Sequence, residues 1–130
     1  MRQTVLTSPF FKEWTIAAAA DLISIKRAFL AEDFTKVGEI LEHNAMTMHA
    51  TTLSAKPPFT YFDQDSLAVM DAVRELREAG VEAYFTMDAG PNVKVVCLRR
   101  DETKVAEKLK AIVESVFICH AGEGAKVIER

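Results

Sequence analysis

Asp88 is the acidic residue whose position best suits catalysis, because it ends a predicted strand and precedes the turn Ala89-Gly90-Pro91-Asn92. A glycine in such a turn lets the backbone approach a ligand, and loops held by a rigid strand often carry functional groups. A carboxylate there could serve acid–base chemistry. From spacing alone, however, the favoured interpretation is that Asp88 accepts hydrogen bonds from its own turn. The turn is not a complete phosphate-binding loop, since it contains a proline without an amide hydrogen and leads into a strand.

The histidines and cysteines do not suggest a metal centre or an activated nucleophile. His43 and His49 are six residues apart on a predicted helix, which turns them to different faces, and His120 lies in a distant predicted strand. We interpret His49 as an interior or capping histidine. Cys97 and Cys119 lie within predicted strands, so we expect two buried thiols in a reducing compartment. The sequence therefore predicts no metal site.

The spacing of apolar residues predicts four main helices. The first begins at Ser8-Pro9, and the second is capped by Asp33 and stopped by Lys56-Pro57-Pro58. The third is capped around Asp63 or Asp65 and ends at Gly80, and Asp101 caps the fourth. The expected buried positions are Trp14, Ala18, Leu22, Ile25 and Phe29 in the first helix, Phe34, Val37, Leu41, Ala45 and Met48 in the second, Leu67, Met70, Val73 and Leu76 in the third, and Val105, Leu109 and Ile112 in the fourth.

Alternation of apolar and polar residues from Val81 to Met87 predicts a strand, which the turn joins to an antiparallel partner at 93–98. Another strand is expected at 117–121, and a short extended segment at 59–62. This order contains most of a ferredoxin-like unit preceded by two additional helices. We therefore predict an α+β fold, a ferredoxin-like antiparallel sheet packed with helices, in a single domain over residues 1–130.

Composition excludes some classes of partner. The chain has 130 residues and a formal charge of -3, with its basic residues scattered rather than massed. We therefore expect no nucleic acid and no membrane partner. The nearly uncharged stretch 14–20 is too short to span a bilayer, and the amino terminus lacks signal-peptide features, which predicts a cytoplasmic protein. The residues by themselves support only an α+β domain that presents an acid at a loop.

One sequence motif indicates a protein family. The segment FTMDAGPNVKVVCL, residues 85–98, resembles the signature of mevalonate diphosphate decarboxylases, members of the GHMP kinase superfamily. The resemblance extends to about Val113 through three further stretches, which are TSPFFKEW at 7–14, the helix from Asp33 into NAMTMHAT, and MHATTLSAKPPFTYF at 48–62. It implies the carboxy-terminal domain fold of that superfamily. It also implies ATP-dependent decarboxylation of mevalonate 5-diphosphate to isopentenyl diphosphate, in the mevalonate pathway of isoprenoid biosynthesis.

The resemblance assigns roles to three residues. Asp88 matches the catalytic acid that approaches the tertiary 3-hydroxyl of the substrate, and Met1 and Ala89 match substrate-binding positions. Met1 aligns with the last residue of a family SSR-x-G-M stretch, so we expect the amino-terminal ATP-binding half to be missing from this chain. The intact enzyme then needs ATP and magnesium, while this chain holds no cofactor and is inactive alone. Dimerisation is common in the family, so the resemblance also implies a homodimer.

Two alternatives stay open at this stage. One is a related enzyme that decarboxylates mevalonate 5-phosphate or that phosphorylates the 3-hydroxyl and stops there. Asp88 argues against the second of these activities, while the choice between mono- and diphosphate depends mainly on residues outside the chain. The other alternative, from a different class, is a stand-alone ferredoxin-like module for ligand binding or dimerisation.

Overall fold

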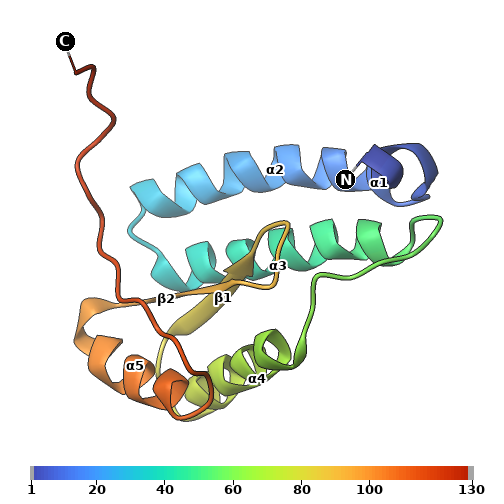
Figure 1. Cartoon of the computed structure of the whole chain (residues 1–130). Helices are drawn as coiled ribbons and strands as arrows, with labels where there is room; N and C mark the ends of the chain where they lie inside the picture. Colours follow the sequence, from blue (N-terminus) through green and yellow to red (C-terminus); the bar gives the residue numbers. More distant parts are fainter. Residues whose placement is uncertain (1, 129–130) are drawn as a thin grey trace.

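The computed structural model describes residues 2–128 and arranges them in three tiers (Figure 1). Helices α2 and α3 lie side by side, a two-stranded hairpin lies next to α3, and α4 and α5 lie on the other side of the hairpin. No helix in this range is both long and apolar enough to cross a membrane. The elements are α1 Arg2–Thr7, α2 Phe11–Leu30, α3 Phe34–Leu53, α4 Gln64–Glu78, β1 Ala83–Met87, β2 Val93–Cys97, a 3-10 turn Arg99–Asp101 and α5 Glu102–Lys110.

Local capping explains several helix ends. The Asp33 side chain accepts from the Lys36 N–H at the start of α3. Asp63 and Ser66 form a capping box at the start of α4, in which each side chain bonds the other residue's backbone N–H. Gly80 follows α4 with a φ of 81°, a left-handed conformation that glycine adopts without a Cβ penalty. The Asp33 cap and the helix end at Gly80 are confirmed, and of the two candidate caps for α4 the structure uses Asp63. The reciprocal bond with Ser66 was not predicted.

Two predicted helix starts are wrong. Helix α2 begins at Phe11 rather than at Ser8-Pro9, and the separate short helix α1 precedes it. The Ser8 hydroxyl lies 2.7 Å from the Ser54 hydroxyl, so it joins the ends of two helices instead of capping one. Asp101 makes no capping bond, because a 3-10 turn leads directly into α5. Competing contacts and a tighter turn thus replaced two expected caps.

The hairpin is antiparallel, with Met87 opposite Val93 and Thr86 opposite Lys94. This confirms the α+β class and the predicted pairing. The remaining predicted strands are wrong, since within residues 2–128 neither 59–62 nor 117–121 joins the sheet. The 117–121 segment does lie near β2, where it borders a groove of about 460 Å³ together with α5. Phe117 is 88% exposed, so this segment lacks the one-sided burial that stabilises a strand.

The main core lies between α4, β1 and α5. The predicted buried faces are confirmed at positions that point into this core or toward the hairpin, but Leu22, Phe29, Leu67 and Ile112 are exposed. Helix α2 is packed mainly on α3, so its buried stripe is narrower than its apolar pattern. Cys119 is also exposed, contrary to the expectation of two buried thiols. The buried core members are Val69, Met70, Ala72, Val73, Leu76, Val81, Ala83, Phe85, Met87, Val105 and Leu109.

Gly38 on α3 lies against the ring of Tyr84 on β1, and we expect Gly38→Ala to destabilise the fold. A Cβ at this position would overlap ring atoms of Tyr84, which is itself buried. The expected net loss is about 1–3 kcal/mol in the free energy of unfolding, because overpacking outweighs the helix propensity that alanine adds. Urea unfolding measures this loss. Gly124→Ala is the control, since no atom lies within 4 Å of its added Cβ. An unchanged midpoint for Gly38→Ala would show that the two elements separate easily.

Candidate functional site

Asp88 follows β1 directly, and its side chain is 84% exposed. Its carboxylate pairs with the ammonium group of Lys94 on β2, the diagonal neighbour across the hairpin. The Asp88 carbonyl accepts from the Gly90 N–H at 2.9 Å. The backbone of the turn is therefore fixed by its own hydrogen bond, while the carboxylate faces outward. A surface carboxylate on a strand end can orient a hydroxyl group or accept its proton.

The turn after Asp88 does not fit a nucleotide phosphate. A phosphate cradle needs several free backbone N–H groups that converge on one point. Here the Gly90 N–H already donates within the turn, and Pro91 has no amide hydrogen. The chain's own residues at this position thus present an acid rather than a phosphate-binding loop.

The other predicted substrate-binding residues differ in what the structure says of them. Ala89 is exposed directly beside Asp88, so it shares the same surface. Met1 lies outside the described residues. The roles of all three residues stay predictions.

The three histidines do not come together. His43 is exposed and its Nδ1 lies 3.2 Å from the Asp21 carboxylate, whereas His120 Nε2 lies 2.6 Å from the Glu102 carboxylate. His49 is 1% exposed, as predicted for an interior histidine. Within the described part of the chain, no group of three or more His, Cys, Asp or Glu side chains is arranged to hold a metal ion.

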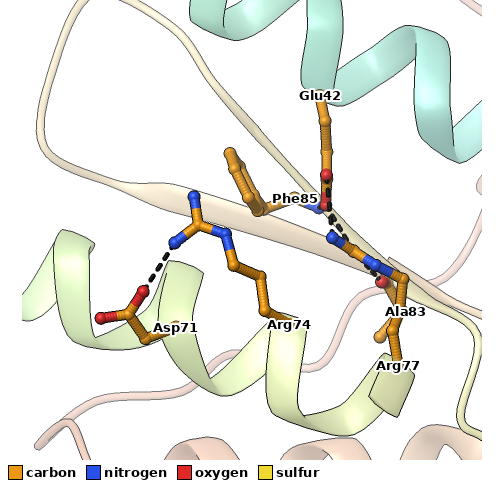
Figure 2. Close-up of polar contacts among 6 residues, drawn as sticks. All are labelled: Glu42, Asp71, Arg74, Arg77, Ala83 and Phe85. Carbon is orange, nitrogen blue, oxygen red and sulfur yellow. Dashed lines mark hydrogen bonds and ion pairs between the residues drawn. The ribbon is translucent and has the colours of Figure 1, made fainter.

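An ion pair that was not predicted braces the strand carrying Asp88 (Figure 2). Glu42 on α3 accepts from the two guanidinium nitrogens of Arg77 on α4, at 2.6 Å and 3.1 Å. The same carboxylate accepts from the Phe85 N–H at 3.0 Å, and Arg77 also donates to the Ala83 carbonyl at 2.7 Å. The sequence pattern places Arg77 on a solvated helix face. No local spacing reveals its partner, which is 35 residues away.

Two grooves in the described residues lie away from Asp88. The smaller one is lined by Phe10, Trp14 and Ala17 from the first part of the chain and by residues of α3. The larger groove lies between β2, α5 and the carboxy-terminal segment. Neither groove includes Asp88, so the acid lies on an open surface, and a closed site around it would need a further wall.

Comparison with known proteins decides the family. The family model described as the mevalonate 5-diphosphate decarboxylase C-terminal domain matches residues 1–128. The chain belongs to this family. The mevalonate diphosphate decarboxylase structure from Staphylococcus aureus is 44% identical with a TM-score of 0.80, covering 84% of this chain and 33% of that one. The mevalonate diphosphate decarboxylase structure from Enterococcus faecalis is 43% identical with a TM-score of 0.82, covering 85% of this chain and 35% of that one. That structure describes ATP binding mediated by mevalonate diphosphate.

Curated relatives give the same family. The diphosphomevalonate decarboxylase of Debaryomyces hansenii is 31% identical over 81% of this chain and 28% of its own length. The phosphomevalonate decarboxylase of Haloferax volcanii is 27% identical over 85% of this chain and 34% of its own length. This chain thus spans about a third of the length of the relatives that it matches.

Proposed function

We propose that this decarboxylase-family chain forms part of an enzyme that converts mevalonate 5-diphosphate to isopentenyl diphosphate in an ATP-dependent decarboxylation. The observation that carries the proposal is the exposed Asp88 carboxylate at the fixed end of β1, inside the segment that the family model matches. In the mevalonate pathway, such an enzyme supplies isoprenoid biosynthesis. The proposed compartment is the cytoplasm.

In the proposed reaction, Asp88 orients the tertiary 3-hydroxyl of the substrate and accepts its proton as the hydroxyl is phosphorylated. Phosphoryl transfer asks the protein mainly for alignment and electrostatic stabilisation, which a carboxylate on a rigid strand end provides. Asp88 then passes this proton to solvent and becomes a carboxylate again. When the phosphate leaves, positive character develops on the substrate carbon, and the negative charge of the carboxylate stabilises it. Ala89, and Met1 at the start of the chain, contact the substrate in this proposal.

ATP and magnesium take part in the intact enzyme, and the proposal assigns their binding to residues outside this chain. The turn after Asp88 lacks the free amides that a nucleotide phosphate needs. The sequence also lacks a serine- and glycine-rich phosphate loop. In this proposal, residues outside this chain supply both the nucleotide site and the opposite wall of the cleft.

Two protein partners belong to this proposal, the amino-terminal domain and a second copy of the chain in a homodimer. Large exposed apolar patches commonly mark protein contact surfaces. The outer side of α2 exposes several large apolar side chains, which supports a role for this helix in such contacts. They are Ile16, Leu22, Ile23, Phe29 and Leu30.

A second candidate substrate is mevalonate 5-phosphate, favoured by the similarity to the Haloferax volcanii enzyme. The same Asp88 chemistry would serve either substrate, because the two differ at the far end of the molecule. Comparing kcat/KM for the two substrates in an active preparation separates these candidates.

Activity of the chain alone provides the first test. We expect a coupled assay for ATP-dependent carbon dioxide release to give no turnover with this chain and mevalonate 5-diphosphate. The reason is that only one wall of the proposed cleft is present. Measurable turnover would contradict the proposal that the ATP-binding residues lie outside the chain.

A chimera provides the positive test. This chain replaces the matched segment of the Staphylococcus aureus decarboxylase, to which it is 44% identical. We expect the chimera to release carbon dioxide from mevalonate 5-diphosphate only when ATP and magnesium are present. A folded chimera that binds ATP and mevalonate 5-diphosphate but never turns over would overturn the proposed function.

A further inference from the structure

Side chains from the flanking helices close the free edge of β1 (Figure 2). The Phe85 N–H donates to Glu42 Oε1, and the Ala83 carbonyl accepts from Arg77. In an antiparallel pair, the backbone groups of successive residues alternate between facing the partner strand and facing away from it. Ala83 and Phe85 therefore face away from β2. The same alternation turns the backbone of Met87, the last residue of β1, toward this edge.

His49 occupies the far end of this edge. It follows Glu42 by seven residues on α3, about two helical turns, so the two side chains leave the helix on nearly the same face. Its ring is 1% exposed. The ring centroid lies 4.8 Å from that of Phe62 and 5.9 Å from that of Tyr61. The aromatic segment before α4 thus holds the imidazole in a fixed place.

The His49 ring lies beside the Met87 backbone and close to Asp88. Burial lowers the pKa of His49 below its ordinary value, while the Met87 backbone and the Asp88 carboxylate oppose this shift. The imidazole is therefore neutral near pH 7 and keeps one N–H. Neither ring nitrogen makes a hydrogen bond with a described residue in this structure, so both are buried without a partner. A purely apolar ring would fill this space without the cost of burying two ring nitrogens.

We propose that His49 is a positioning residue for Asp88. The neutral ring presents its N–H to the Met87 carbonyl and fixes the last peptide of β1, from which the Asp88 side chain extends. This role rests on the proposed function, in which Asp88 meets the substrate hydroxyl. It explains how an exposed carboxylate is held in register with a substrate, since a displacement of about 1 Å can cost about 10²-fold in rate.

Amide resonances of this chain test the positioning role without any substrate. His49→Phe keeps an aromatic ring against Tyr61 and Phe62 but removes both nitrogens. We expect it to shift the backbone amide resonances of Asp88 and Ala89, while helix α5 keeps its resonances. His49→Asn and His49→Gln restore an N–H group on side chains of two different lengths. One of these variants should return the resonances toward their wild-type positions.

The matched control is His43→Phe, which changes an exposed histidine on the same helix and should leave the Asp88 amide unchanged. Unchanged Asp88 and Ala89 resonances in a folded His49→Phe protein overturn the proposal. If this variant does not fold, the His49 imidazole of the wild-type chain provides a separate test. Its nitrogen spectrum should show one neutral tautomer with a slowly exchanging N–H, and a ring that averages between tautomers overturns the proposal.

Kinetics in the chimera separate this inference from the proposed function. We expect His49→Phe to lower kcat by about 10²-fold with little change in KM, because the substrate still binds while the carboxylate is displaced. The same Asn or Gln variant that restores the resonances should restore part of kcat. A His49→Phe chimera with wild-type kcat overturns the positioning role alone. An inactive chimera that retains His49 overturns the proposed function. The amide-resonance test of the positioning role does not depend on that result.

Discussion

Replacing Asp88 by asparagine in the chimera should lower kcat by about 10²–10⁴-fold, the range that a positioned acid or base commonly contributes. The substitution keeps the shape of the side chain and removes its charge and its capacity to accept a proton. Binding of mevalonate 5-diphosphate and of ATP should change little, because the carboxylate meets one hydroxyl group and not the phosphates. Steady-state carbon dioxide release measures kcat, and calorimetry measures both affinities.

Asp71→Asn is the matched control for this experiment. Asp71 is also an exposed acid, 70% accessible and paired with Arg74, but it lies on α4 and not in the turn after β1. We expect its removal to leave kcat near that of the unmodified chimera, since an exposed pair contributes about 0.2–1 kcal/mol to stability. Near-normal turnover of Asp88→Asn would remove the chemical basis of the proposed function.

Glu42→Ala should cost about 2–4 kcal/mol in the free energy of unfolding. The carboxylate accepts two hydrogen bonds from Arg77 and one from the Phe85 N–H, so its loss leaves a guanidinium and a backbone donor without their partner. Breaking a buried pair costs about 3–5 kcal/mol, and we expect less here because the two side chains are 18% and 27% exposed. Urea unfolding followed by circular dichroism measures the change.

Glu39→Ala on the same helix controls for helix propensity. Its pair with Lys36 is more than half exposed on both sides, so we expect a loss below about 1 kcal/mol. Replacing both partners, as Glu42→Leu with Arg77→Met, should recover part of the stability lost by Glu42→Ala, because no unpaired charge then remains. Equal unfolding midpoints for Glu42→Ala and Glu39→Ala would show that the pair does not brace β1.

The acid at the centre of the proposal illustrates what sequence reasoning can supply. The position of Asp88 suggested a catalytic acid, but spacing alone favoured a turn-capping role, and it was the resemblance of residues 85–98 to a decarboxylase signature that made the catalytic role the preferred one. The structure adds that the side chain is exposed and that the turn is closed by its own backbone bond. An interior Asp88 would have contradicted the prediction.

The amino-acid sequence determined the features that depend on neighbours a few residues apart. The Asp33 cap, a cap at Asp63, the helix end at Gly80 and the alternation along β1 all follow from such local contacts, and each formed as predicted. Helix caps and strand alternation depend on residues that are close in the sequence, so distant segments are not needed to specify them.

Only the tertiary structure decided which distant side chains meet. Glu42 found Arg77 across 35 positions, and His49 reached the end of β1, because α3 packs along a strand edge that no local spacing specifies. The same reason explains the failed strand at 117–121, whose residues have strand-like types but no partner in the described part of the chain that buries one of their faces. A periodic pattern states which face is apolar, whereas burial depends on what packs against it.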